Sequence, residues 1–223
     1  MKDLRPLRGL RLLQELIDQG EHEHQDFKFL ISDARKIARS ISAFANNDGG
    51  RLLVGVKDNG VIAGVRSEED LYMIEQAATM YCLPEVEVEF SAIKAGNGMV
   101  VYIAQIPRAA KRPIRVLESD KRLQAYFRVA DENIVAHPLM VQAWIYRDSN
   151  LMSMSIGREE CAILDFLRDR HPLTFNELEI AVECRLSLTS ARKIISRLAA
   201  MELINFVYNN QEFRITIPLE ECE

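Results

Sequence analysis

The sequence has few cysteines and no closely spaced pair of them. Its four cysteines, Cys82, Cys161, Cys184 and Cys222, lie far apart along the chain. This spacing argues against a zinc ribbon and against a disulfide framework, both of which need cysteines at short, regular intervals. We therefore expect reduced thiols, with Cys161 and Cys184 serving as small core residues.

A long apolar run is also missing. Nowhere does the chain reach the roughly 18 consecutive apolar residues that a membrane-spanning helix needs. Residues 1–20 begin with basic side chains, but their apolar residues recur at helical spacing and do not form the unbroken core of a secretion signal. These absences predict a cytoplasmic protein without a membrane segment.

The sequence contains no phosphate loop of the type G-x-x-x-x-G-K-S/T. The pair Gly49-Gly50 follows a predicted helix and opens a predicted strand, which is the reverse of the strand-to-helix order in phosphate-binding loops. We expect these glycines to form a tight turn between helix and strand.

Basic residues do not outnumber acidic ones. The chain of 223 residues carries 28 Lys and Arg against 33 Asp and Glu, a net charge of -5. This balance excludes a surface covered throughout with nucleic acid but allows a local basic patch. Because 48% of the residues are apolar and 27% are charged, the chain is expected to fold, and its length favours two domains.

The first part of the chain alternates helical periodicity with strand patterns. Apolar residues at helical spacing are followed by Gly20, which favours a helix end there. Alternating and β-branched runs around turn residues such as Asn59-Gly60 predict hairpins. The predicted elements are helices at 10–17, 33–46 and 68–81, a short strand at 27–31, and hairpins at 51–65, 85–106 and 112–130.

From Gly157 onward the pattern changes to three short helices and one hairpin. Thr174 is a candidate cap for the second helix, with Glu177 as its capping-box partner, and Ser187 is a candidate cap for the third. The final hairpin is expected to turn at Asn209-Asn210. This order is that of a winged helix-turn-helix, so we expect domains at 1–145 and 156–223, with a short helix and linker between them.

Three carboxylates precede or follow two predicted strands. Glu21 and Asp26 precede the short strand, and Asp58 comes at the end of the apolar strand "RLLVGV". If those strands are neighbours, the three side chains would meet and could hold Mg²⁺ or Mn²⁺, which prefer oxygen ligands and can activate water for phosphodiester cleavage. The alternative is that all three are turn residues exposed to solvent.

Four segments together resemble the Schlafen/AlbA-like domain. They are "EHEHQDFKF", the helix end "ISAFANNDGG", the strand and turn "RLLVGVKDNGVIAGV", and "AYFRVADENIVA", and the resemblance covers about residues 14–140. It implies an α+β fold with a mixed sheet and helices, followed here by a small winged helix-turn-helix domain. It also implies nucleic-acid binding, and in bacteria the domain often precedes a winged helix in proteins described as transcriptional regulators.

Some Schlafen members are RNA endonucleases that use three carboxylates. Aligned by their motif, the corresponding residues here are Glu21, Asp26 and Asp58, and Lys28 would stabilise charge on the phosphate. The chain departs from the family pattern at Asp26, where Glu is usual, and at Ala130, where the family has Gly. The shorter Asp26 side chain would need a shifted backbone to reach the same metal ion.

Two basic segments are candidates for nucleic-acid contact. The first is a loop run that can hold phosphates without reading sequence, and its alternative is an ordinary solvated loop. The second is the third helix of the C-terminal domain, which in a helix-turn-helix enters the major groove. Because the hairpin turn lacks Lys and Arg, a protein-binding role for that domain is the alternative. The candidate residues are Lys111, Arg112 and Arg115 in the loop, and Thr189, Ser190, Arg192, Lys193 and Arg197 in the helix.

Three functions therefore stand after the sequence alone. The first is a nucleic-acid-binding protein, a DNA-binding transcriptional regulator that needs no cofactor for binding. The second is a nuclease dependent on Mg²⁺ or Mn²⁺, acting on RNA or DNA. The third is an interaction module whose winged helix pairs two copies of the chain, and homodimerisation is expected in all three cases.

Overall fold

The computed structural model describes residues 5–6, 9–95, 98–149, 156–169, 173–174 and 176–218. The contacts divide the chain into two compact units, Met1–Ala136 and His137–Glu223. The division lies earlier than the expected domain end at residue 145, because helix α4 (Pro138–Asp148) packs against helix α7 (Leu188–Ala200) of the second unit.

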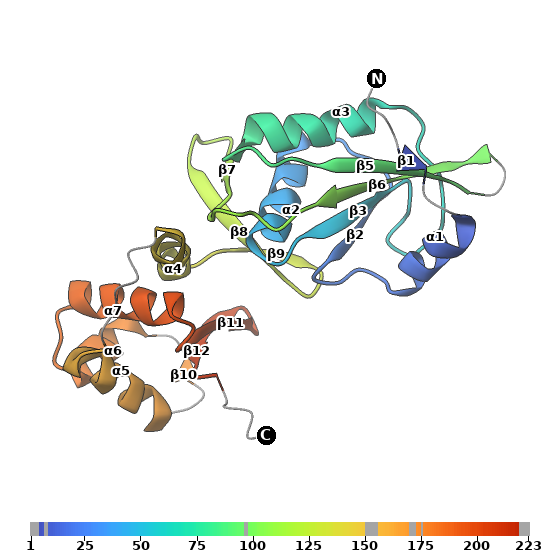
Figure 1. Cartoon of the computed structure of the whole chain (residues 1–223). Coiled ribbons are helices and arrows are strands. Elements are labelled where there is room, and N and C mark those ends of the chain that lie inside the picture. The colour runs from blue at the N-terminus through green and yellow to red at the C-terminus, as the bar shows by residue number, and fades with distance from the viewer. Residues whose placement is uncertain are drawn as a thin grey trace. The chain divides into compact units, whose positions relative to one another are not determined.

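The first unit is built on a mixed five-stranded sheet (Figure 1). The strand order is β1 (Arg5–Pro6), β5 (Glu89–Lys94), β6 (Val100–Ile106), β3 (Gly50–Val54) and β2 (Gln25–Lys28). The outer pairs β1–β5 and β2–β3 are parallel, whereas β5–β6 and β3–β6 are antiparallel.

Two helices cover opposite faces of this sheet. Leu52 and Val54 of β3 pack with helix α2 (Ala34–Asn46), whereas Leu53 between them packs with helix α1 (Gly9–Asp18). This alternation follows from the two-residue period of a strand. A strand that is apolar at every position is therefore buried on both sides, as the unbroken run "LLV" suggests.

Helix α2 also packs against a second sheet of the same unit (Figure 1). The hairpins predicted at 85–106 and 112–130 are confirmed, but the one predicted at 51–65 is reduced to an isolated bridge between Val56 and Ile62. The second sheet has the order β4 (Cys82–Leu83), β7 (Arg115–Leu117), β8 (Leu123–Val129) and β9 (Glu132–Val135). Helix α3 (Glu69–Gln76) and the π-helical turn η1 (Ala77–Tyr81) precede β4.

The second unit contains helices followed by a hairpin. Its core is formed by the buried side chains of Ile163, Ile195 and Leu198. The antiparallel sheet has the order β10-β12-β11. After α4, the elements are α5 (Arg158–Asp169), β10 (Leu173–Thr174), α6 (Glu177–Glu183), α7, β11 (Asn205–Asn209) and β12 (Glu212–Thr216).

The caps in this unit partly differ from those expected. Ser187 caps α7 as predicted, with its hydroxyl accepting from the Ser190 amide at 3.0 Å. The prediction that Thr174 caps α6 is wrong, because the side-chain Oδ1 of Asn176 accepts from the amides of Leu178 and Glu179 instead. Asparagine lies directly before the helix and is itself a favoured cap residue.

No helix in the described part of the chain is both long enough and apolar enough to cross a bilayer.

Candidate functional site

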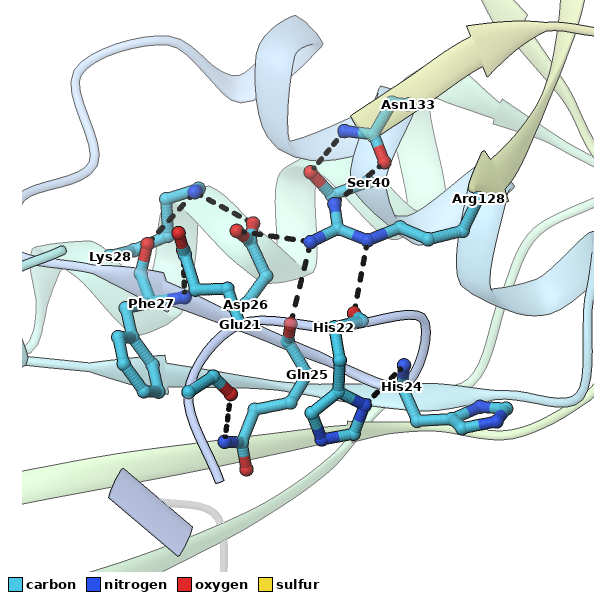
Figure 2. Close-up of polar contacts among 11 residues, drawn as sticks. Glu21, His22, His24, Gln25, Asp26, Phe27, Lys28, Ser40, Arg128 and Asn133 are labelled. Carbon is cyan, nitrogen blue, oxygen red and sulfur yellow. Dashed lines mark hydrogen bonds and ion pairs between the residues drawn. The ribbon is translucent and has the colours of Figure 1, made fainter. Parts of the chain in front are cut away.

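Strand β2 and the turn before it carry Asp26 and Glu21, two of the three carboxylates predicted to form a site (Figure 2). Asp26 is only 4% exposed, and its two carboxylate oxygens lie 2.6 Å from Lys28 Nζ and 3.4 Å from Arg128 Nη2. A buried carboxylate with a cation at each oxygen is electrostatically neutralised from both sides. Asp26 is therefore already occupied by side chains of the chain itself.

Glu21 lies beside Asp26. Its Oε1 accepts a hydrogen bond from the Phe27 amide at 2.8 Å. Burial raises the pKa of Glu21 above its usual value, and the neighbouring Asp26 carboxyl group raises it further.

Asp58 does not join this pair. The neighbouring strands β2 and β3 run parallel, as the hypothesis required, but β3 ends at Val54. Gly55, with φ of +96°, then turns the chain into a separate loop in which Asp58 is exposed. Among the described residues, no three His, Cys, Asp or Glu side chains come close enough together to hold a metal ion. The predicted Mg²⁺ or Mn²⁺ site of Glu21, Asp26 and Asp58 therefore does not fit this geometry.

Arg128 is the centre of a buried polar cluster that the sequence did not reveal (Figure 2). It is 2% exposed and donates to the carbonyl oxygens of His22 and Gln25, both at 3.4 Å, and to Asn133 Oδ1 at 2.9 Å. Its guanidinium also lies 5.0 Å from the ring centre of Phe44. Arg128 thus ties strand β8 to strand β2 and to helix α2.

The polar run at the end of α2 has a structural role. Asn46 donates to the carbonyl oxygens of Ile114 and Tyr126 at 2.9 and 2.8 Å, and its Oδ1 accepts from the Ile114 amide. The side chain of Asn47 donates to the Arg128 carbonyl oxygen and accepts from the Arg128 amide. The two side chains therefore complete the hydrogen bonding of backbone segments that would otherwise lack partners.

Gly49 forms the predicted tight turn. Its φ is +81°, and a Cβ atom there would lie 2.8 Å from the carbonyl oxygen of Ile106. Only glycine fits such a left-handed position at so close an approach.

The basic loop of the first unit does not present all its predicted residues to solvent. Lys111 is exposed, but Arg112 is half-buried and donates from Nη1 to the Asn46 carbonyl oxygen at 3.0 Å. Arg115 is half-buried within β7. Of the three, Lys111 is therefore the residue best placed to contact a phosphate.

The predicted residues of α7 fall into two groups. Thr189, Arg192 and Lys193 are exposed, at the spacing that places residues on one face of a helix. Arg192 also forms an ion pair with Glu177 of α6. In contrast, Ser190 takes part in the cap, and Arg197 is paired with the buried Glu160 at 3.0 Å. We define Thr189, Arg192 and Lys193 as the α7 face.

Comparison with known protein families gives one assignment. The family model described as "Schlafen, AlbA_2" matches residues 21–137, a little more than half of the chain. The chain belongs to this family. The matched range contains Glu21, Asp26, Arg128 and both asparagines of the α2 end, so the resemblance seen in the sequence is confirmed for the first unit. The α7 face lies outside it.

Among curated proteins, none matches the chain. Among solved structures, the DIP2311 protein from Corynebacterium diphtheriae is similar at a TM-score of 0.42 and 17% sequence identity. The match covers 86% of this chain and 34% of that one, so the chain spans about a third of that protein's length.

Proposed function

We propose that this Schlafen, AlbA_2 protein binds nucleic acid and that its second unit is a winged helix with α7 as the DNA-reading helix. The observation that carries this proposal is the α7 face, which offers one hydroxyl and two cations to solvent. Arginine and lysine at the start of such a helix suit phosphate oxygens and guanine edges in the major groove.

The order of elements supports the winged-helix assignment. Helix α5, strand β10, helices α6 and α7 and the hairpin β11–β12 follow one another as in a winged helix-turn-helix. We propose a cytoplasmic transcriptional regulator that acts as a homodimer, because two copies would present two α7 helices to a palindromic operator.

One observation favours a second candidate, in which the same unit binds protein. Leu178 and Val182 of α6 are 61% and 67% exposed and lie one helical turn apart. Glu179 and Glu183 are on the same helix, and acidic residues are unfavourable beside DNA phosphates. A dimer contact through α6 would explain this composition.

The test measures binding of labelled duplex DNA by fluorescence anisotropy over a range of salt concentrations. Lys193→Ala should weaken binding about 3- to 10-fold and reduce the slope of log K against log salt by about 1, because one phosphate contact is lost. Lys94→Ala, which removes an equally exposed lysine from β5, is the matched control.

Equal affinities for Lys193→Ala, Lys94→Ala and the unaltered protein would contradict the proposed role of α7. In that case, sedimentation of a Leu178→Ser variant tests the second candidate, which predicts a dimer that dissociates.

A further inference from the structure

A second cationic site lies in the first unit, around the ring of Phe29. Lys57 Nζ lies 5.4 Å and Arg66 Cζ lies 5.6 Å from the centre of this ring. Phe29 is half-buried, whereas both cations are exposed. In the described part of the chain, neither cation is paired with a carboxylate, so two positive charges converge on one aromatic ring without a counter-charge in contact.

The backbone on either side of Phe29 is held firmly. The Lys28 carbonyl oxygen accepts from the Gly55 amide at 2.8 Å, and the Ile31 amide donates to Asp70 Oδ1 at 3.0 Å. Asp70 is 5% exposed, so this hydrogen bond is sheltered from water. A backbone that is already fixed on both sides of Phe29 loses little further freedom when a ligand binds.

Exposed apolar side chains adjoin the cation–ring cluster along the chain. Leu30 follows Phe29 directly and is 55% exposed, and Val61 is 51% exposed. The Lys57 amide donates to the Val61 carbonyl oxygen at 3.0 Å, which keeps Val61 next to Lys57. An aromatic ring with exposed apolar residues and cations nearby suits a ligand that has both planar rings and negative charges.

We propose that Phe29, Lys57 and Arg66 form a contact site for single-stranded nucleic acid. A base stacks on the Phe29 ring, and the displaced cation moves to the adjoining phosphate. Stacking of a base on an aromatic ring is stronger than an exposed cation–π contact, so this exchange is favourable. The inference rests on the proposed nucleic-acid binding but uses a surface of the first unit and does not need α7.

The nearby acid limits the strength of this site. Asp58 is exposed in the same loop as Lys57 and repels phosphate. We therefore expect an Asp58→Asn variant to bind single strands more tightly than the unaltered protein, in contrast to the loss of function that a metal-ligand role would predict.

The main experiment measures binding of fluorescent oligothymidylate and oligouridylate, each of about 20 nucleotides, to the full chain. Phe29→Leu keeps an apolar side chain but removes the stacking surface, and should weaken binding about 10-fold or more. Phe29→Trp should bind at least as well as the unaltered protein, which shows that the site is folded. Tyr72→Leu, at a 65% exposed position of α3, is the matched control and should change nothing.

The cations are tested separately. Lys57→Gln and Arg66→Gln should each lower the salt dependence of single-strand binding by about 0.7 in the log–log slope, and Lys94→Gln should leave it unchanged. An oligonucleotide with 2-aminopurine among its bases adds a direct readout, because its fluorescence should be quenched on the unaltered protein and less so on Phe29→Leu.

The outcomes separate this inference from the proposed role of α7. Binding of single strands that is equal for Phe29→Leu and Tyr72→Leu would overturn the inference, even if duplex binding through Lys193 is intact. Single-strand binding that needs Phe29 in a protein that ignores duplex DNA would support the inference and overturn the role of α7. The two oligonucleotides show whether RNA or DNA is preferred, and failure to bind either would also overturn the inference.

Discussion

The polar residues singled out in the two units differ in burial: those of the first unit lie inside the fold, and those of the second unit face solvent. In the first unit, the polar run that ends α2 and the arginine of β8 point inward, where Asn46 and Arg128 are 1% and 2% exposed and make several hydrogen bonds each. In the second unit, the α7 face is directed to solvent. The comparison shows that a polar motif can contact a ligand only where its side chains reach solvent, as they do on the α7 face even though Arg192 also pairs with Glu177.

Each unit also contains an exception that makes the comparison testable. Arg197 lies on the same helix as Lys193, but it is paired with the buried Glu160 and serves the fold. In the first unit, Arg108 forms an ion pair with Asp48 in which both side chains are largely exposed. The same substitution can therefore be compared at a buried and at an exposed cation within each unit.

The largest effect is expected at Arg128. An Arg128→Met substitution removes a buried cation and leaves Asp26 with Lys28 as its remaining cation, so the free energy of unfolding should fall by about 3–5 kcal/mol. Arg108→Met should cost less than about 1 kcal/mol because surface ion pairs contribute little. Urea unfolding followed by circular dichroism measures both, and equal losses would contradict the buried role of Arg128.

A smaller difference is expected along α7. Arg197→Met leaves the buried Glu160 without its arginine and should lower the stability of the second unit by about 1–3 kcal/mol. Lys193→Met should leave stability nearly unchanged while weakening duplex binding. Thermal unfolding of the two variants measures the stability loss expected for Arg197→Met, and the anisotropy assay measures the loss of duplex binding expected for Lys193→Met. A Lys193→Met variant that unfolds at as low a temperature as Arg197→Met would contradict the difference between the buried and the exposed cations of α7.

The smallest effect concerns pH. Hydrogen bonds from Arg39 at 2.9 and 2.7 Å, followed in importance by one from Tyr126, hold the pKa of Glu118 below its usual value. A carboxylate with a lowered folded-state pKa adds stability above its unfolded pKa of about 4.3, and that stability is lost as the pH falls through the folded value.

Glu118→Gln should therefore be about 1 kcal/mol less stable than the unaltered protein at neutral pH, and the difference should vanish in acid. Unfolding midpoints between about pH 7 and pH 3 measure this convergence. Glu132→Gln, at an exposed position of β9, is the control that should follow the unaltered protein. If the unfolding midpoints of Glu118→Gln and of the unaltered protein differ by the same amount at every pH, the lowered pKa of Glu118 is contradicted.

Much of the fold could be predicted because its signals are local. Helix α2 begins after its Asp33 cap and ends near Gly49, and α7 begins after Ser187, as their sequences indicate. A local signal also misled. The capping-box spacing favoured Thr174 as the cap of α6, whereas the structure shows that Asn176 is the cap.

The candidate site was predictable only in part. The sequence indicated that Glu21, Asp26 and Asp58 would meet if two strands were neighbours, and that the third helix of the second domain carries basic residues. By itself, it thus determined the family and most of the order of elements, but not which of the acids come together. The tertiary structure decided that Asp58 leaves the acidic pair, that Arg128 fills the space beside Asp26, and that Phe29 receives two cations. These contacts join residues far apart in the sequence, so they depend on how the strands and loops pack, which no local pattern records.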